Sequence, residues 1–145
     1  METVKRFVRF IRYNRHKKLS ILAMIYAAYY RLLIFMVPPK YLKPKWGLEG
    51  EESAEKEVIE IYCYAKKVSY AVNRICNKTA WESKCLVRAL TAKKLLKMKG
   101  ILSTMYLGCN VEDGNMTAHA WLRCGEMYVT GGDGKGYAIV DKFCS

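Results

Sequence analysis

Residues 81–90 read WESKCLVRAL and place a cysteine at the beginning of a predicted helix. Ser83 is a suitable N-cap and Gly100 is a residue type that commonly ends a helix, so the helix body spans residues 84–99. Cys85 then lies in the first turn, where the positive end of the helix favours the nucleophilic thiolate. The predicted buried face holds Leu86, Ala89, Leu90, Leu95 and Leu96, and the predicted solvent face holds Lys93, Lys94, Lys97 and Lys99.

The other five cysteines lack this setting, because they fall in helix interiors, in strands, in a turn or near the C-terminus. No Cys-x-x-Cys pair occurs, so the short-spaced ligands of a zinc site are missing, and we expect no metal and no organic cofactor. The N-terminus also lacks the pattern of a secretory signal peptide. We therefore expect a reducing cytoplasm, in which most of these thiols are buried and inert.

His119 is the candidate partner of Cys85. It lies in the segment TAHAW, residues 117–121, midway along a predicted strand. A histidine on a sheet that packs against a helix start can meet a cysteine there and act as its base. Taken alone, a cysteine at a helix start is more often a packed thiol, and His119 is equally compatible with a core histidine. Because side chains alternate along a strand, one face presents Thr117, His119 and Trp121, and the other presents Ala118, Ala120 and Leu122.

The rest of the chain predicts helices first and an antiparallel sheet afterwards, which is the α+β class. Ser53 is a suitable cap for a further helix, and residues 40–52 read as a linker from their Pro, Gly and charges. We divide the chain into a basic helical segment, 1–45, and a core, 46–145, which are expected to form one compact unit. The predicted helices span residues 1–18, 19–37, 53–76 and 84–99, and the predicted strands span 103–111, 116–123, 127–130 and 137–143.

The positive charge is concentrated in the N-terminal third. Residues 1–45 hold eleven Lys and Arg and one acidic residue, whereas residues 46–145 hold fourteen basic and twelve acidic residues. The apolar stretch 19–37 is nearly long enough to span a bilayer, but Arg31 interrupts it and tyrosines occupy its centre, which favours a buried helix. We expect the basic segment to dock on an acidic protein face or on an anionic membrane surface.

The residues around Cys85 and His119 resemble one known family. After WESKCLVRAL at 81–90 come LL at 95–96, GI at 100–101 and AHAW at 118–121, in the order and spacing of the leader peptidase (B protein) of lasso-peptide biosynthesis. The match covers residues 81–132, a little over a third of the chain. The resemblance implies a papain/transglutaminase-like cysteine protease core, with the nucleophile at a helix N-terminus and a small antiparallel sheet.

The resemblance also implies an activity, namely removal of the leader peptide from a ribosomally synthesised precursor by a stand-alone bacterial subunit. Cys85 would attack the scissile carbonyl, and His119 would take the thiol proton and return it to the leaving amine. The backbone N–H of Cys85 would be one oxyanion donor. The implied partners are the leader region of the precursor, a separate small leader-binding protein, and an ATP-dependent lasso cyclase that closes the ring.

The third catalytic residue is where the sequence departs from the family pattern. Such enzymes usually place an Asp on the strand after the histidine, and the nearest here is Asp133, in the glycine-rich loop 131–136. Pairing about the turn at 124–126 puts residues 130–132 opposite His119, so Thr130 or a backbone carbonyl is an alternative to Asp133. Trp81 and Trp121 are candidate substrate contacts, with core packing as the alternative, and Trp121 on the His119 face would shield the pair from water.

Two other functions remain open from the sequence. A transglutaminase-like acyltransferase would use the same pair and pass the acyl group to an amine, although no acidic calcium-type loop is apparent. A basic nucleic-acid-binding module would use the positive N-terminal third for phosphate contacts. No nucleic-acid motif is visible, however, and that function leaves Cys85 and His119 without a role, so we expect no nucleic-acid partner.

Overall fold

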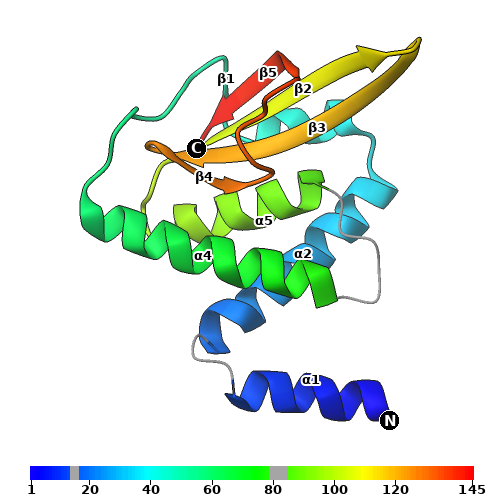
Figure 1. Ribbon diagram of the computed structural model, residues 1–145, viewed down its shortest axis with the longest axis vertical. Helices are drawn as coiled ribbons and strands as arrows, with labels where there is room; N and C mark the ends of the chain where they lie inside the picture. The colour runs from blue at the N-terminus through cyan, green and yellow to red at the C-terminus, as the bar shows by residue number, and fades with distance from the viewer. Residues whose placement is uncertain (14–16, 79–84) are drawn as a thin grey trace.

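The computed structural model describes residues 1–13, 17–78 and 85–145, and its architecture is α+β, as predicted. Helices pack against one face of an antiparallel five-stranded sheet (Figure 1). The helices are α1 (Glu2–Tyr13), α2 (Lys17–Met36), α3 (Pro39–Leu42), the 3₁₀ helix η1 (Lys43–Lys45), α4 (Ile59–Lys78) and α5 (Cys85–Met98). The strands are β1 (Leu48–Glu49), β2 (Thr104–Glu112), β3 (Asn115–Cys124), β4 (Met127–Thr130) and β5 (Ala138–Cys144).

The sheet has the strand order β1-β5-β2-β3-β4, and each neighbouring pair is antiparallel. Asp113 and Gly114 connect β2 to β3 and both have positive φ angles, 51° and 77°, as a tight two-residue hairpin turn requires. The four predicted strands are confirmed to within one residue at each end. β4 is short, and its pairing with β3 ends where Leu122 faces Thr130.

α5 is the central helix of the helical layer. It packs against α2 and α4 and also against β3. The inward side chains of β3, Ala120 and Leu122, lie in the same buried cluster as Leu95 and Leu96 of α5. Because α5 begins at Cys85, as the sequence predicts to within one residue, this packing carries the cysteine to the face of β3.

The predicted linker and the start of α4 need correction. α4 begins at Ile59, and Ser53 does not cap it: the Ser53 N–H donates to Thr104 Oγ1 at 2.7 Å, and the two hydroxyl oxygens lie 2.8 Å apart. Part of the linker forms α3, η1 and β1, and Trp46 within it is buried edge-on against the Phe143 ring, with centroids 5.5 Å apart. Pro and Gly indicate an irregular segment, and the structure shows that its tryptophan belongs to the core whereas Tyr41 is exposed.

α2 is buried on one side only. Ala23 and Ala27 join the core that α4, α5 and the sheet share, so the predicted burial is found on one side of the helix, whereas apolar side chains on its other side are exposed. Among the described helices, α2 is long and apolar enough to cross a membrane, with a mean hydropathy of 1.8 over an 18-residue window, a criterion that core helices also meet. The predicted division at residues 45 and 46 stays a prediction.

Arg123 of β3 ties the segment before α4 to the sheet. It is only 9% exposed. Its guanidinium donates to the carbonyl oxygens of Ser53 at 3.2 Å, Ala54 at 3.1 Å and Gly125 at 2.8 Å. It also donates to the Tyr106 hydroxyl at 3.0 Å. The several N–H donors of one guanidinium thus satisfy main-chain carbonyls that have no strand partner in this irregular segment.

We expect Arg123→Met to lower the free energy of unfolding by about 2–4 kcal/mol, because it leaves three buried or half-buried carbonyls without their donor. Arg123→Lys retains the charge but has fewer N–H donors, and we expect it to lose less stability than Arg123→Met. Chemical denaturation of both variants measures this. Equal stability of the Met variant and the wild type would show that the network does not hold the segment in place.

The prediction that Lys93 lies on the solvent face of α5 is wrong, because its side chain is only 5% exposed. Its Nζ reaches the Ser103 carbonyl oxygen at 3.4 Å. Burial lowers the pKa of Lys93 from 10.5 to about 8. Below pH 8 the folded chain must hold a buried ammonium, which lowers stability. Between pH 8 and 10.5 the Lys93 amine is protonated in the unfolded chain and neutral in the folded one. The free energy of unfolding therefore rises with pH over this range.

Lys93→Met should therefore raise the Tm by a few degrees at neutral pH, with the difference from wild type shrinking as the pH approaches 10.5. Lys67→Met, which removes an exposed lysine of α4, is the matched control and should change little. Thermal unfolding at several pH values measures both variants. A stabilisation by Lys93→Met that is the same at every pH would contradict a titrating buried lysine.

Candidate active site

Cys85 is half-buried at the first residue of α5. Its Sγ accepts a hydrogen bond from the Ala120 N–H of β3 at 3.4 Å. The first backbone N–H groups of an α-helix have no partner within the helix, so the sulfur lies at the end that carries the partial positive charge. The contact with Ala120 places the thiol next to the main chain of His119, the preceding residue of the strand, and within the described residues no hydrogen bond joins Sγ to the imidazole ring.

The other cysteines lie in different surroundings. No disulfide joins the six cysteines, all of them in the described part of the chain, and Cys76, Cys124 and Cys144 are buried. Burial raises the pKa of Cys124 to about 11, which keeps that thiol protonated and inert at neutral pH. Cys63, the most exposed of the six, lies in the interior of α4, away from a helix N-terminus. Cys85 is thus the cysteine that the fold places at the start of a helix.

The His119 ring has a fixed hydrogen-bond partner. Its Nε2 lies 2.6 Å from the carbonyl oxygen of Gly131, directly after β4. A carbonyl oxygen only accepts, so Nε2 carries the proton in this pairing. In the neutral imidazole, Nδ1 then presents a lone pair, and among the described residues no hydrogen bond engages it. This tautomer is the one that a general base needs.

Two aromatic rings lie close to the imidazole. The ring centroid of His119 lies 4.9 Å from that of Tyr137 and 5.8 Å from that of Trp121, which is stacked at 22°. Trp121 in turn stacks on its cross-strand partner Tyr106, at 5.5 Å and 16°. Together the rings line the outward face of β3, as strand alternation predicts for His119 and Trp121. The imidazole is therefore positioned by stacking as well as by the Gly131 carbonyl.

Three glycines enclose Trp121. A Cβ at Gly134 would lie 2.3 Å from the indole ring, and a Cβ at Gly108 would lie 2.7 Å from it. A Cβ at Gly131 would lie 2.5 Å from the Ala120 carbonyl oxygen and 2.8 Å from the Trp121 Cβ. Loop 131–136 thus packs closely on the tryptophan, which is only 3% exposed. This close packing accounts for Gly131 and Gly134, whereas nothing lies within 4 Å of a Cβ at Gly132 or Gly136.

Asp133 is not joined to His119 by any hydrogen bond between described residues. One of its carboxylate oxygens accepts the Lys135 N–H at 3.0 Å, a local turn contact, and its side chain is exposed. Thr130 Oγ1 is buried and has no partner within the described part of the chain. Of the three alternatives for orienting the ring, a backbone carbonyl is the one found beside Nε2. The catalytic role of Asp133 stays a prediction.

The two candidate substrate contacts differ in what can be said of them. Trp81 lies outside the described residues, as do the N-cap Ser83 and the whole segment 79–84. Trp121 is buried under its neighbours, which agrees with a shielding role and leaves little of its surface for a substrate. Sequence reasoning gave a backbone carbonyl near residues 130–132 as one alternative but missed Tyr137, because a ring contact across a loop leaves no residue pattern.

A helix-start cysteine next to a strand histidine, on an α+β core, is the arrangement of papain-like and transglutaminase-like enzymes. Residues 44–140, more than half of the chain, match the family model Transglut_core3, the transglutaminase-like superfamily. The chain therefore belongs to the transglutaminase-like superfamily, which generally contains Cys-His-Asp enzymes and includes cysteine proteases and acyltransferases. No curated protein and no solved structure matches the chain significantly. Within the described residues, no group of three His, Cys, Asp or Glu side chains could hold a metal ion.

We expect Gly134→Ala to disturb the site more than Gly132→Ala does. Both positions have positive φ angles, +70° and +74°, so both variants carry a similar backbone cost of about 1–2 kcal/mol. Only the new Cβ at 134 meets Trp121, since nothing lies within 4 Å of a Cβ at 132. Near-ultraviolet circular dichroism and denaturation compare the pair. Indistinguishable spectra and stabilities would mean that the loop yields freely and does not hold the tryptophan.

Proposed function

We propose that the protein is a cysteine peptidase that removes the leader peptide from a ribosomally synthesised lasso-peptide precursor. The observation that carries the proposal is the 3.4 Å contact between Cys85 Sγ and the Ala120 N–H, which brings a helix-start thiol beside His119. The choice of substrate rests on the resemblance of residues 81–132 to the leader peptidases. Membership of the transglutaminase-like superfamily supports the acyl-transfer chemistry common to these enzymes.

The first chemical step forms an acyl-enzyme. His119 accepts the proton of the Cys85 thiol on Nδ1, and the sulfur attacks the carbonyl carbon of the scissile peptide bond. The negative charge passes to the carbonyl oxygen, and the N–H of Cys85, which has no partner within α5, is one donor for it. When the C–N bond breaks, the imidazolium returns its proton to the leaving amine.

The second step releases the leader. A water molecule gives a proton to Nδ1 of His119 and attacks the thioester carbonyl, and the thiol leaves with that proton restored. The hydrogen bond from Nε2–H to the Gly131 carbonyl, at 2.6 Å, holds the ring so that Nδ1 can accept and return the proton in both steps. Trp121 and Tyr137 limit rotation of the ring and cover one side of it. An amine in place of water would give an acyltransferase with the same acyl-enzyme.

The proposed partners follow from the same resemblance. The precursor supplies its leader region, a separate small protein binds that leader, and an ATP-dependent cyclase takes the released core peptide. Recognition by a separate subunit leaves the peptidase itself with few demands on leader sequence. We therefore expect cleavage to be weak when the leader-binding protein is absent.

The test is mass spectrometry of a precursor peptide incubated with the protein and its leader-binding partner. We expect cleavage at one bond, and a loss of about 10³-fold or more in Cys85→Ala and His119→Ala. Cys63→Ala, which removes an exposed thiol on α4, is the matched control and should cleave normally. Cleavage that survives Cys85→Ala would sink the proposal, and a product joined to an added amine instead of water would identify the acyltransferase.

Asp133→Ala tests the third catalytic position in the same assay. We expect a much smaller loss than in His119→Ala, because the carboxylate is bonded to the Lys135 N–H and a carbonyl occupies Nε2. A loss as large as that of His119→Ala would instead mean that the loop rearranges during catalysis and that Asp133 does orient the ring, as in the family pattern.

A further inference from the structure

The outward face of α2 is apolar along its whole length. Its exposed large side chains recur every three or four residues, which places them on one side of the helix. Near the C-terminal end of α2 they are strongly exposed, at 59% for Leu32 and 80% for Phe35. The opposite side is the one that buries Ser20, Ala23 and Ala27. The exposed set is Ile21, Ile25, Tyr29, Leu32, Phe35 and Met36, which we call the α2 face.

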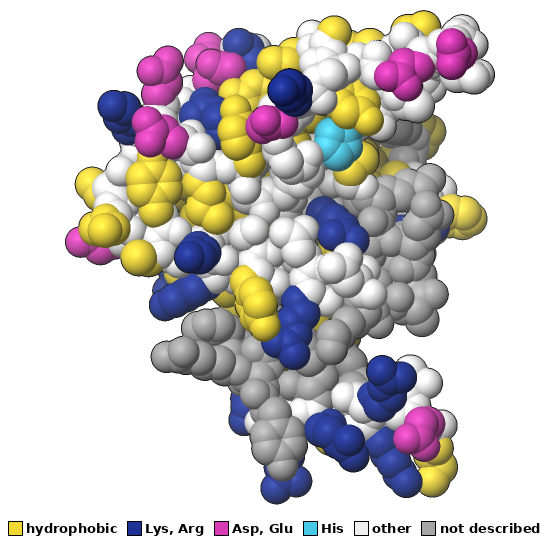
Figure 2. Space-filling view, viewed as in Figure 1, with side chains coloured by type: hydrophobic (Ala, Val, Ile, Leu, Met, Phe, Trp, Pro, Cys, Tyr) yellow, Lys and Arg dark blue, Asp and Glu magenta, His cyan; other side chains and the backbone are white. Residues whose placement is uncertain are grey.

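Basic side chains surround the α2 face. Lys5, Arg6, Arg9 and Arg12 are exposed on α1, and Lys17 and Lys18 are exposed at the start of α2. Residues 1–45 contain only one acidic residue, Glu2, at the far end of α1. In Figure 2 the Lys and Arg side chains gather at the lower end, over α1 and the neighbouring helices, whereas Asp and Glu side chains gather mainly at the sheet end.

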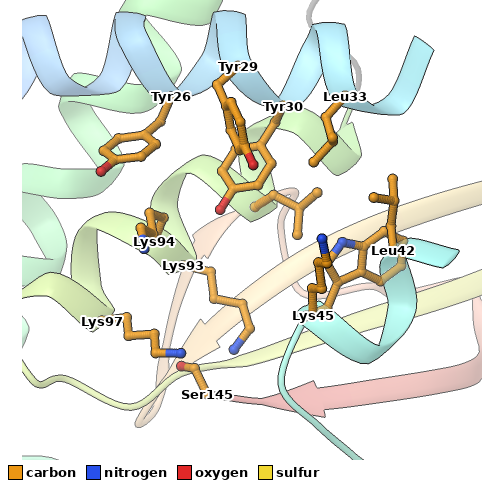
Figure 3. A pocket seen from close by; sticks show the side chains of 12 residues that line it. Tyr26, Tyr29, Tyr30, Leu33, Leu42, Lys45, Lys93, Lys94, Lys97 and Ser145 are labelled. Atoms are coloured by element: carbon orange, nitrogen blue, oxygen red, sulfur yellow. The ribbon is translucent and has the colours of Figure 1, made fainter. Parts of the chain in front are cut away.

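A cavity of about 310 Å³ borders the α2 face. Three tyrosines of α2 line one wall, and lysines of α5 and η1 line the other (Figure 3). No acidic side chain lines it, and Lys93 is its buried cation. Tyr29, 53% exposed, belongs both to the cavity wall and to the α2 face. The charged residues of the wall are Lys45, Lys93, Lys94 and Lys97.

We propose that the α2 face lies flat on an anionic phospholipid surface, with a headgroup phosphate in the tyrosine–lysine cavity. The apolar side chains enter the acyl boundary, and the cations of α1 and of the cavity meet the negative headgroups. The helix does not span the bilayer, because its other side packs on α4 and α5 in the common core. The inference is independent of the peptidase activity.

Other occupants of the face fit these observations less well. A nucleic acid would pair with the cations but would leave the six apolar side chains uncovered. A second copy would bring together two segments that each carry eleven basic residues and one acidic residue, which repel each other. A lipid surface satisfies the apolar and the basic groups at once. An acidic protein partner would have to carry a matching apolar groove.

Vesicle flotation tests the proposal with the full chain. We expect wild type to float with vesicles of phosphatidylcholine and phosphatidylglycerol, and to bind pure phosphatidylcholine at least about tenfold more weakly. Leu32→Glu/Phe35→Glu should lower binding by about tenfold or more. Lys94→Gln/Lys97→Gln should weaken binding to the anionic vesicles only. Leu32, Phe35 and Lys97 are exposed and Lys94 is half-buried, so we expect both double variants to fold. Circular dichroism checks this.

Two matched controls separate the face from general charge effects. Met116→Glu/Ile139→Glu makes the same charge change at exposed positions of the sheet, 73% and 57%, and should float like wild type. Lys66→Gln/Lys67→Gln removes two exposed lysines of α4 and should also change little. The proposal fails if wild type does not float, or if Leu32→Glu/Phe35→Glu floats equally well. A wild-type dimer that Leu32→Glu/Phe35→Glu converts to monomer would assign the face to a second copy instead.

Discussion

The candidate site depends on one contact, the hydrogen bond from the Ala120 N–H to Cys85 Sγ. It joins the start of α5 to the middle of β3, two elements whose approach is otherwise set by packing of apolar side chains. β4 makes this contact feasible by stopping early, because its pairing with β3 ends at Leu122 and Thr130. A longer β4 would run alongside Ala120 and compete with the sulfur for its N–H.

The same early end of β4 positions the base. Past Thr130 the chain turns through Gly131 at a φ of 76°, and the Gly131 carbonyl then lies against His119 Nε2. A neutral carbonyl selects the tautomer without adding a negative charge beside the imidazole. The loop is held in turn by its fit against Trp121, where a Cβ at Gly134 would approach within 2.3 Å of the indole. Orientation of the base is thus a property of main chain and packing.

The sequence predicted the scaffold better than the contacts within it. Strand alternation and the turn at Asp113-Gly114 have local causes, so β2, β3, β4 and β5 and the start of α5 could be predicted. Strand pairing limited the partner of His119 to a few groups, including a carbonyl near residues 130–132, but the choice among them could not be predicted, because only the fold decides which group comes near. The predicted exposure of Lys93 was wrong for a related reason. Lysine is a polar residue type, but residues of α2 and η1 lie around it and it is buried. The predicted helix start at Ser53 was wrong because the Ser53 hydroxyl is hydrogen-bonded to the Thr104 hydroxyl.

α5 connects the candidate active site with the cavity that we propose binds lipid headgroups. Its first residue is Cys85, and Lys93 of the cavity follows eight residues later, about 12 Å along the helix axis. Since the N-terminus of a helix attracts anions and electron-rich groups, the thiol belongs at the start of α5. Lys97, in the last turn of α5, complements the negative C-terminal end of the helix, whereas Lys93 lies before that turn and burial lowers its pKa. One helix dipole therefore favours a nucleophile at one end and a basic surface at the other, and the sheet covers the first while α2 covers the second.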